Sequence, residues 1–233
     1  MSDELPPQAC PGAAPRAALF DVDGTLVDTN DLHAAAWREA FLHFGLDQPV
    51  EAIRRQVGKG GDNLIPALFP DLPKAPQGEI EQFRSGLFKR DYLSRATPFA
   101  GVRPLFERLA GDGVTIVLAS SSDAEEVAFH LGLIDCADLV AATTSKDDVD
   151  RSKPCPDIFA AALAKAALGV DEAAAVGDTP WDAIAATRLG LRIIGMRCGG
   201  FPDPALAAAG ACELYDGPWD LDACYDRSVF GRG

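Results

Sequence analysis

Basic residues are scarce in this chain, in which 21 lysines and arginines stand against 35 aspartates and glutamates among 233 residues. The formal net charge is therefore -14. A surface with this excess of negative charge repels phosphate backbones, which excludes a nucleic-acid partner bound through a basic face. The sequence also has no uninterrupted apolar run of about eighteen residues, which excludes a membrane-spanning helix and a membrane partner.

The sequence predicts neither a secretory leader nor a paired cysteine motif. The opening residues, MSDELPPQACPGAAP, have no basic start and no apolar segment, and their Pro, Gly and Ala content predicts a flexible tail over residues 1–15. The cysteines form no C-x-x-C pair and match no zinc-binding spacing. We therefore expect a cytoplasmic protein with free thiols at all six cysteines, namely Cys10, Cys136, Cys155, Cys198, Cys212 and Cys224.

Apolar residues are plentiful, at 48% of the chain, which supplies a sizeable core and excludes disorder of the whole protein. The length suits one large domain, or one domain that carries a smaller insert. Monomer and dimer remain equally open.

Short apolar runs alternate with helix-length segments along most of the chain. Short apolar runs that end at glycine or polar residues are typical of buried parallel strands, and they cover residues 17–20, 114–119, 173–176 and 191–195, with Thr115 and Arg192 as the polar exceptions within them. Helical segments lie between them at 102–110, 124–131, 156–168 and 181–189. This alternation predicts an α/β fold, a Rossmann-like parallel sheet with helices on both faces.

One long interval departs from this alternation. It contains no strand-like run, and apolar residues recur in it at helical spacing, as at Ala36, Trp37, Ala40 and Phe41. Four helices are predicted there, at 31–44, 50–57, 63–69 and 79–94. The sequence therefore predicts an all-helical insert over residues 29–97 within an α/β core formed by residues 16–28 and 98–233.

Polar residues follow three of the predicted strands directly. Asp21 and Asp23 follow the first, Ser120 the second and Asp178 the third. Sites in parallel sheets lie beyond the carboxyl ends of the strands, so we expect these side chains to meet. Two close carboxylates in a cleft are stabilised by a divalent cation, or by a proton on one of them, which can then act as an acid; a carboxylate can also attack phosphorus.

The run Asp21-Val22-Asp23-Gly24-Thr25-Leu26-Val27 resembles the first motif of the haloacid dehalogenase superfamily. The later motifs resemble those of the family in the same order, with Ser120 as the second, Lys153 as the third and Gly177-Asp178-Thr179-Pro180-Trp181-Asp182 as the fourth. The resemblance spans residues 17–215. The helical insert is similar to the first type of cap in this family, which places the chain near phosphoglycolate phosphatases and β-phosphoglucomutases.

The resemblance implies a phosphatase acting on a small phosphorylated metabolite. Asp21 corresponds to the nucleophile and Asp23 to the general acid and base. Ser120 corresponds to the hydroxyl that binds the transferring phosphoryl group, with Ser121 beside it at a helix start, where backbone N–H groups form an anion cradle. Lys153 corresponds to the lysine that balances charge on nucleophile and phosphate.

The resemblance also implies Mg²⁺ as the cofactor, in a shell of oxygen ligands. Asp21 and Asp178 would bind it through their carboxylates and Asp23 through its backbone carbonyl. Asp182 would orient this shell from a second layer.

Several of these residues also have ordinary structural explanations. Ser120 and Asp178 could each be the N-cap of a following helix, and Lys153 could be a solvated surface lysine. Lys59 lies in the loop Gly58-Lys59-Gly60-Gly61-Asp62-Asn63, which is either a glycine-rich turn or a substrate contact. The three histidines, His33, His43 and His130, are expected on the surface or in packing positions rather than as ligands.

Three other functions compete with the phosphatase. A dehalogenase of the family lacks the second carboxylate, so Asp23 argues against that activity. A β-phosphoglucomutase-like sugar-phosphate mutase shares both aspartates, but mutases of this branch carry an arginine in the loop where this chain has Lys59. A non-catalytic Mg²⁺ or ligand-binding domain is disfavoured because none of the motif residues is missing.

Overall fold

The computed structural model describes residues 12–231, and its centre is a parallel sheet in the order β5-β4-β1-β6-β7-β8. All five strand pairings of this sheet are parallel. Its strands are β1 (Ala17–Phe20), β4 (Thr115–Ala119), β5 (Val140–Thr144), β6 (Ala173–Gly177), β7 (Arg192–Met196) and β8 (Glu213–Tyr215). The predicted α/β class with a parallel sheet is confirmed.

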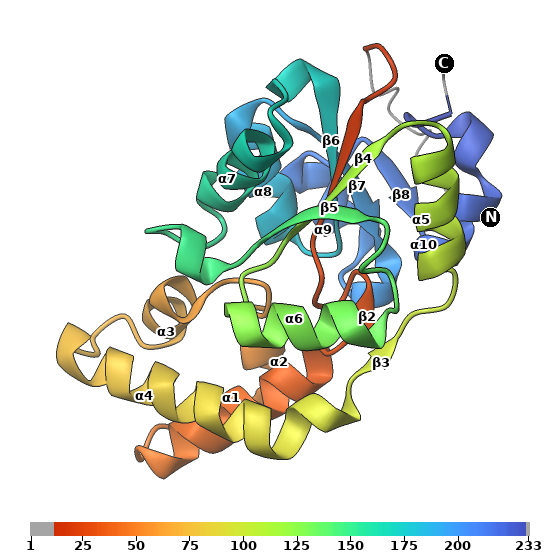
Figure 1. Ribbon diagram of the computed structural model, residues 1–233. Coiled ribbons are helices and arrows are strands. Elements are labelled where there is room, and N and C mark those ends of the chain that lie inside the picture. The colour runs from red at the N-terminus through yellow and green to blue at the C-terminus, as the bar shows by residue number, and fades with distance from the viewer. Residues whose placement is uncertain (1–11, 232–233) are drawn as a thin grey trace, which may run out of the picture.

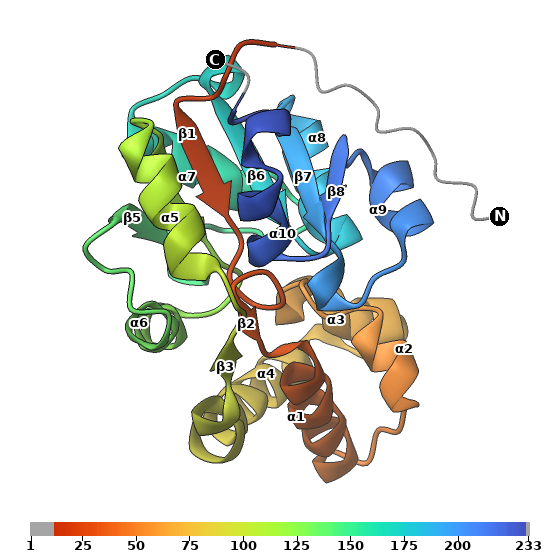
Figure 2. The same ribbon diagram turned by 90° about the vertical axis from the view of Figure 1, so that its right-hand side faces the viewer.

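Helices cover both faces of this sheet (Figure 2). On one face lie α5 (Val102–Gly111) and α10 (Pro218–Ala223), and on the other lie α7 (Asp157–Ala166) and α8 (Pro180–Leu189). α9 (Asp203–Ala209) packs beside α8, and α6 (Ala124–Leu133) follows β4.

The alternation of side chains along β1 divides the core into two layers. Ala18 and Phe20 belong to the apolar cluster under α5 and α10, whereas Ala17 and Leu19 belong to the cluster under α7 and α8. All four side chains are fully buried. A strand with both faces covered needs apolar residues at every position, which explains the unbroken apolar run.

The interval predicted as an insert is helical between two short strands, β2 (Val27–Asp28) and β3 (Thr97–Pro98), which pair antiparallel. Its α-helices are α1 (Asn30–His43), α2 (Val50–Arg54), α3 (Gly61–Leu68) and α4 (Lys74–Leu87). A π-helical turn (Phe88–Tyr92) and a 3-10 turn (Leu93–Arg95) complete it. These helices gather beyond one end of the central sheet and have an apolar core of their own, centred on Trp37 and Phe41 (Figure 1).

One expectation from the sequence is wrong in part, and another falls mostly outside the described residues. Cys212 is disulfide-bonded, so the prediction of a free thiol is wrong at that position. The argument from free cysteines to a cytoplasmic location therefore does not hold for Cys212. Cys136, Cys155, Cys198 and Cys224 are free, and Cys10 lies outside the described residues. Of the predicted tail, residues 1–11 also lie outside them, and residues 12–15 form neither helix nor strand.

Within residues 12–231, no helix is both long enough and apolar enough to cross a membrane.

Candidate active site

The polar residues that follow β1, β4 and β6 meet at one edge of the sheet, because these three strands are neighbours and run in the same direction. The Thr25 hydroxyl joins two of them, donating at 3.2 Å to Asp21 Oδ2 and at 3.0 Å to Asp178 Oδ1. The Asn30 amide donates at 2.7 Å to the other oxygen of Asp178. All four side chains are buried. The chain thus holds two carboxylates side by side in fixed orientations.

A tight turn at Gly24 makes this arrangement possible. Gly24 has a φ of +84°, and its N–H donates to the Val27 carbonyl at 2.7 Å. A Cβ at this position would lie 2.1 Å from Asn30 Nδ2 and 2.4 Å from Asp178 Oδ2. Glycine is therefore required here both by the backbone conformation and by the two side chains that close over it.

Gly24→Ala is expected to lower kcat/KM by about tenfold or more for the phosphate-ester hydrolysis that the sequence predicts, because the new methyl group displaces Asn30 and Asp178. Gly45→Ala is the matched control, since Gly45 also has a positive φ, of +74°, but no described atom lies within 4 Å of its Cβ position. Both variants should lose about 1–2 kcal/mol of unfolding free energy from backbone strain. Equal activity of the two variants in a steady-state assay would contradict this account.

Lys153 is buried among acceptors, with only 1% of its surface exposed. Its ammonium group contacts the Asp21 carboxylate and lies 2.7 Å from Asp182 Oδ1 and 3.2 Å from the Ala119 carbonyl oxygen. Burial alone disfavours the charge, but Asp182 and Asp21 outweigh it and raise the pKa of Lys153. Lys153 is therefore a charged partner of Asp21 and not a surface lysine.

Asp21, Asp178 and Asp182 form a buried group of carboxylates, each offering an oxygen within 4.8 Å of the others. Burial and the neighbouring carboxylates raise the pKa of Asp21 well above its ordinary value, although Lys153 opposes this. Burial and Asp182 likewise raise the pKa of Asp178 to about 7. Such crowding is relieved by a cation, and an all-oxygen donor set fits Mg²⁺.

The N-cap explanations for Ser120 and Asp178 are wrong. The N-cap of α8 is Thr179, whose hydroxyl accepts from the Asp182 N–H while Asp182 Oδ2 accepts from the Thr179 N–H at 3.0 Å. The N-cap of α6 is Asp123. Ser120 and Asp178 thus remain available to the site, whereas one oxygen of Asp182 caps a helix and the other faces Lys153.

Asp23 accepts hydrogen bonds on both carboxylate oxygens. Thr29 Oγ1 donates to Oδ1 at 2.7 Å, and Ser122 Oγ donates to Oδ2 at 2.8 Å. Ser120 Oγ lies 3.4 Å from Oδ2 and accepts the Ser122 N–H at 3.0 Å. The serine run after β4 therefore orients the second aspartate of the D-x-D motif.

Two histidines also face Asp23, a contact that the sequence, which predicted surface or packing positions rather than ligands, did not indicate. Nε2 of His33 lies 2.9 Å from Asp23 Oδ1, and Nε2 of His130 lies 3.3 Å from it. Burial alone would raise the pKa of Asp23, but the two histidines hold it well below its usual range. His33 and His43 also pack against aromatic rings, each stacked at 4.1 Å, on Phe88 and Phe83 respectively.

The proton on His33 can be assigned from its neighbours. The Arg84 guanidinium contacts His33 Nδ1, and because arginine only donates, that nitrogen accepts. Nε2 therefore carries the hydrogen that is donated to Asp23. Burial, together with Arg84, lowers the pKa of His33, which is consistent with a neutral ring. The sequence held one signal for this pair: both histidines lie on helices that begin next to the first two motifs.

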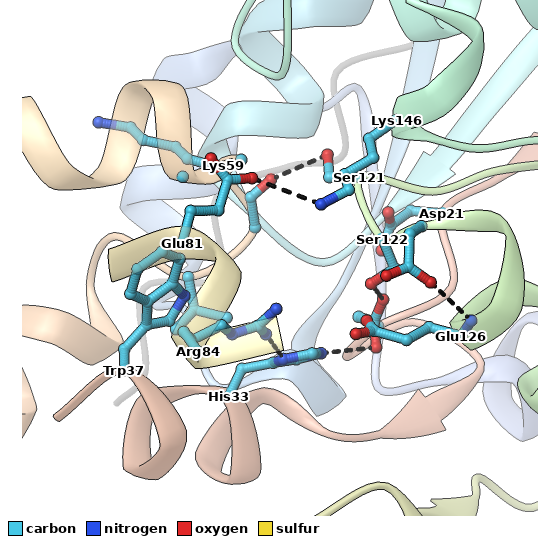
Figure 3. Close-up of a pocket in the computed structure, with 16 residues that line it drawn as sticks. Asp21, His33, Trp37, Lys59, Glu81, Arg84, Ser121, Ser122, Glu126 and Lys146 are labelled. Atoms are coloured by element: carbon cyan, nitrogen blue, oxygen red, sulfur yellow. Dashed lines mark hydrogen bonds and ion pairs between the residues drawn. The ribbon is translucent and has the colours of Figure 1, made fainter. Parts of the chain in front are cut away.

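A pocket lies between the inserted helices and the core, bordered by both aspartates of the D-x-D motif (Figure 3). Ser121 and Lys59, both expected to contact substrate, lie in its lining. Lys59 stands 3.8 Å above the Trp181 ring and donates to Gln56 at 2.7 Å. The other side chains in the lining include His33, Trp37, Val57, Glu81, Arg84, Ser122, Asp123, Glu126 and Lys146.

Contacts across the pocket hold the inserted helices against the core. Lys89 lies 2.9 Å from Asp123, and Lys146 lies 3.4 Å from Glu81. The Ser121 hydroxyl lies 3.4 Å from the Gly58 carbonyl oxygen. The space beside Asp21 is thereby walled from both sides, which suits a small ligand shielded from water.

Comparison with known proteins gives one consistent result. A family model for haloacid dehalogenase-like hydrolases matches residues 15–190. A phosphoglycolate phosphatase of Rhodospirillum rubrum is 26% identical over 212 residues, covering 87% of each chain. A hydrolase from Pseudomonas syringae has a TM-score of 0.86 at 27% identity, over 93% of this chain and 99% of that chain. A protein from Bacteroides vulgatus, named as a candidate β-phosphoglucomutase, has a TM-score of 0.83 at 21% identity, over 94% and 91% of the two chains, and supports the fold alone.

Proposed function

This chain belongs to the haloacid dehalogenase-like hydrolases, and from that premise we propose that it is a Mg²⁺-dependent phosphatase that hydrolyses a small phosphate monoester through an aspartyl phosphate. The observation that carries the proposal is the position of Asp21. Asp21 borders the pocket, contacts Lys153 and lies in the same cluster of buried carboxylates as Asp178. A relative named phosphoglycolate phosphatase supports the same class of reaction.

Asp21 and Asp178 would hold the metal through their carboxylates, and Asp23 through its backbone carbonyl. Bound there, Mg²⁺ supplies positive charge to the phosphoryl oxygens. Asp182 would act on the metal site indirectly, because its oxygens face Lys153 and the start of α8.

In the first step, an Asp21 carboxylate oxygen attacks phosphorus and the ester P–O bond breaks. Asp23 gives its proton to the leaving oxygen. In the second step, water attacks the aspartyl phosphate and gives its proton to Asp23, releasing phosphate and restoring Asp21. His33 and His130 favour the carboxylate form of Asp23, which is the form that the second step requires; for the first step Asp23 must therefore take up a proton when the substrate binds.

Lys153 supplies positive charge beside the nucleophile, and Ser120 would position the phosphoryl group. Lys153 keeps its ammonium charged beside the nucleophile, where it also attracts the phosphoryl oxygens. Ser120 follows β4 and is fully buried, with its hydroxyl 3.4 Å from Asp23 Oδ2 and outside the lining of the pocket; by its motif this hydroxyl would bind the phosphoryl group as Asp21 attacks. Ser121 on the core side and Lys59 on the side of the inserted helices complete the wall of the pocket.

Metal removal is expected to abolish hydrolysis. Treatment with a chelator should lower phosphate release from an aryl phosphate by at least about 100-fold, because three crowded carboxylates then lack a counter-ion. Addition of Mg²⁺ should restore the rate. Activity that is insensitive to the chelator would contradict metal dependence, and conversion of a sugar phosphate into its isomer without net phosphate release would identify a mutase instead.

A further inference from the structure

Glu126 is a buried carboxylate that the proposed mechanism does not use. It lies on α6 with 1% of its surface exposed, and neither of its carboxylate oxygens has a hydrogen-bond partner among the described residues. Its backbone N–H is bound to the Asp123 side chain, so the first turn of the helix holds it in place. Its side chain lines the pocket (Figure 3).

The cations around this pocket are engaged elsewhere. Lys146 pairs with Glu81, Arg84 contacts His33, and Lys59 donates to Gln56. Leaving a carboxylate buried without partners costs free energy, which is typical of a group that waits for a ligand.

Glu126 also lies on the leaving-group side of the pocket. It precedes His130 by four residues on α6, which puts both side chains on one face of the helix, and His130 faces Asp23. Asp23 is the residue that protonates the leaving oxygen in the proposed mechanism. The phosphoryl end, by contrast, is drawn to Lys153 and would be repelled by another carboxylate.

We propose that Glu126 is a specificity-determining residue that accepts a hydrogen bond from the leaving group, so that the substrate is a phosphate monoester carrying a hydroxyl or ammonium group close to the ester. This inference rests on the proposed phosphatase function. The carboxylate group of Glu126 offers two oxygens that can accept hydrogen bonds, which is why the matching group on the substrate is a donor. A site built around such an acceptor rejects the analogue that lacks the donor.

The experiment compares kcat/KM for four substrates: 2-hydroxyethyl phosphate, 2-aminoethyl phosphate, n-propyl phosphate and p-nitrophenyl phosphate. The first three have similar size and differ in the donor. We expect the wild-type protein to prefer at least one donor-bearing ester over n-propyl phosphate by about 10- to 100-fold. Glu126→Leu should reduce this preference to below about threefold, and hydrolysis of p-nitrophenyl phosphate, which carries no such donor, should fall less than hydrolysis of the preferred ester.

Two further variants make the result specific. Glu126→Gln keeps an acceptor oxygen without the charge, so it should retain a preference for the hydroxyl ester and lose one for the ammonium ester. Glu125→Gln is the control, because Glu125 is the neighbouring acid on the same helix, is exposed and pairs with Lys89. It should leave all four values unchanged. Glu126→Leu is expected to fold, since replacing an unpartnered buried carboxylate by an apolar residue is neutral or stabilising.

The outcomes separate the two proposals. If p-nitrophenyl phosphate is hydrolysed but the wild-type protein does not distinguish the three alkyl esters, the role of Glu126 is wrong and the phosphatase stands. The same holds if Glu126→Leu keeps the preference, or lowers all four values equally, which would indicate action through His130 and Asp23. If no phosphate ester is hydrolysed, the proposed function is wrong and this inference falls with it.

Discussion

Asp21→Asn is expected to lower kcat for phosphate release by roughly 10⁴-fold or more, the scale seen when the nucleophile of a covalent mechanism is removed. An amide oxygen is a poor nucleophile, and the two carboxylates grouped with Asp21 are held by other partners: Asp178 receives hydrogen bonds from Thr25 and Asn30, and Asp182 faces Lys153. The measurement is phosphate release from p-nitrophenyl phosphate at saturating Mg²⁺.

The variant should remain folded, which makes the loss of activity interpretable. Asparagine keeps an oxygen that can accept from Lys153, and removing one of three crowded carboxylates relieves the repulsion that raises the pKa of Asp21. Thermal unfolding checks this. Asp28→Asn is the matched control, since Asp28 is an exposed aspartate that follows the same motif. Retention of more than a few percent of the wild-type rate in Asp21→Asn would exclude an aspartyl phosphate at this residue.

Asp23→Asn is expected to lower turnover by about 10²- to 10⁴-fold, the range for loss of a general acid and base. The fold should tolerate it. The new amide can donate towards Ser122 and Ser120, whose hydroxyl groups are able to turn and accept, while its oxygen keeps the hydrogen bonds from Thr29 and His33.

The dependence on the leaving group distinguishes this role from a structural one. p-Nitrophenolate leaves without a proton, so Asp23→Asn should still form the aspartyl phosphate from p-nitrophenyl phosphate, in a rapid burst followed by slow hydrolysis. An alkyl phosphate needs the proton and should lose its first step as well. Equal losses of turnover on the two substrates, without a burst, would contradict the assignment of Asp23 as general acid and base. Near-normal turnover on both substrates would exclude any such role for Asp23.

The central strands were predictable from the sequence because they are buried on both faces. β1, β4, β6 and β7 lie inside the sheet, and their apolar runs begin and end within one residue of the predicted bounds. β5 and β8 lie at the two edges and were missed. β5 reads Val-Ala-Ala-Thr-Thr and is only partly buried, so it lacks the unbroken apolar run that marks its neighbours.

The carboxylates and Lys153 were predictable for a different reason. Each lies in a local motif, and parallel strands bring the ends of β1, β4 and β6 to one edge whatever the details of packing. His33, His130 and Glu126 have no such motif. Their place at the site depends on how α1 and α6 pack around Asp23, and a histidine or glutamate on a helix looks the same in sequence whether it faces solvent or a pocket.

The sequence by itself therefore determined the α/β class, the helical interval between residues 29 and 97, and the order of the acidic, serine and lysine motifs, because these depend on short-range pattern and strand direction. Only the tertiary structure decided which charges face one another. It paired Lys153 with Asp21 and Asp182, surrounded Asp23 with two histidines, and left Glu126 without a partner in the pocket. The physical reason is that pKa and hydrogen bonding are set by neighbours a few ångströms away in space, which in this chain come from segments far apart in the sequence: 132 residues separate Lys153 from Asp21, and 153 separate Thr25 from Asp178.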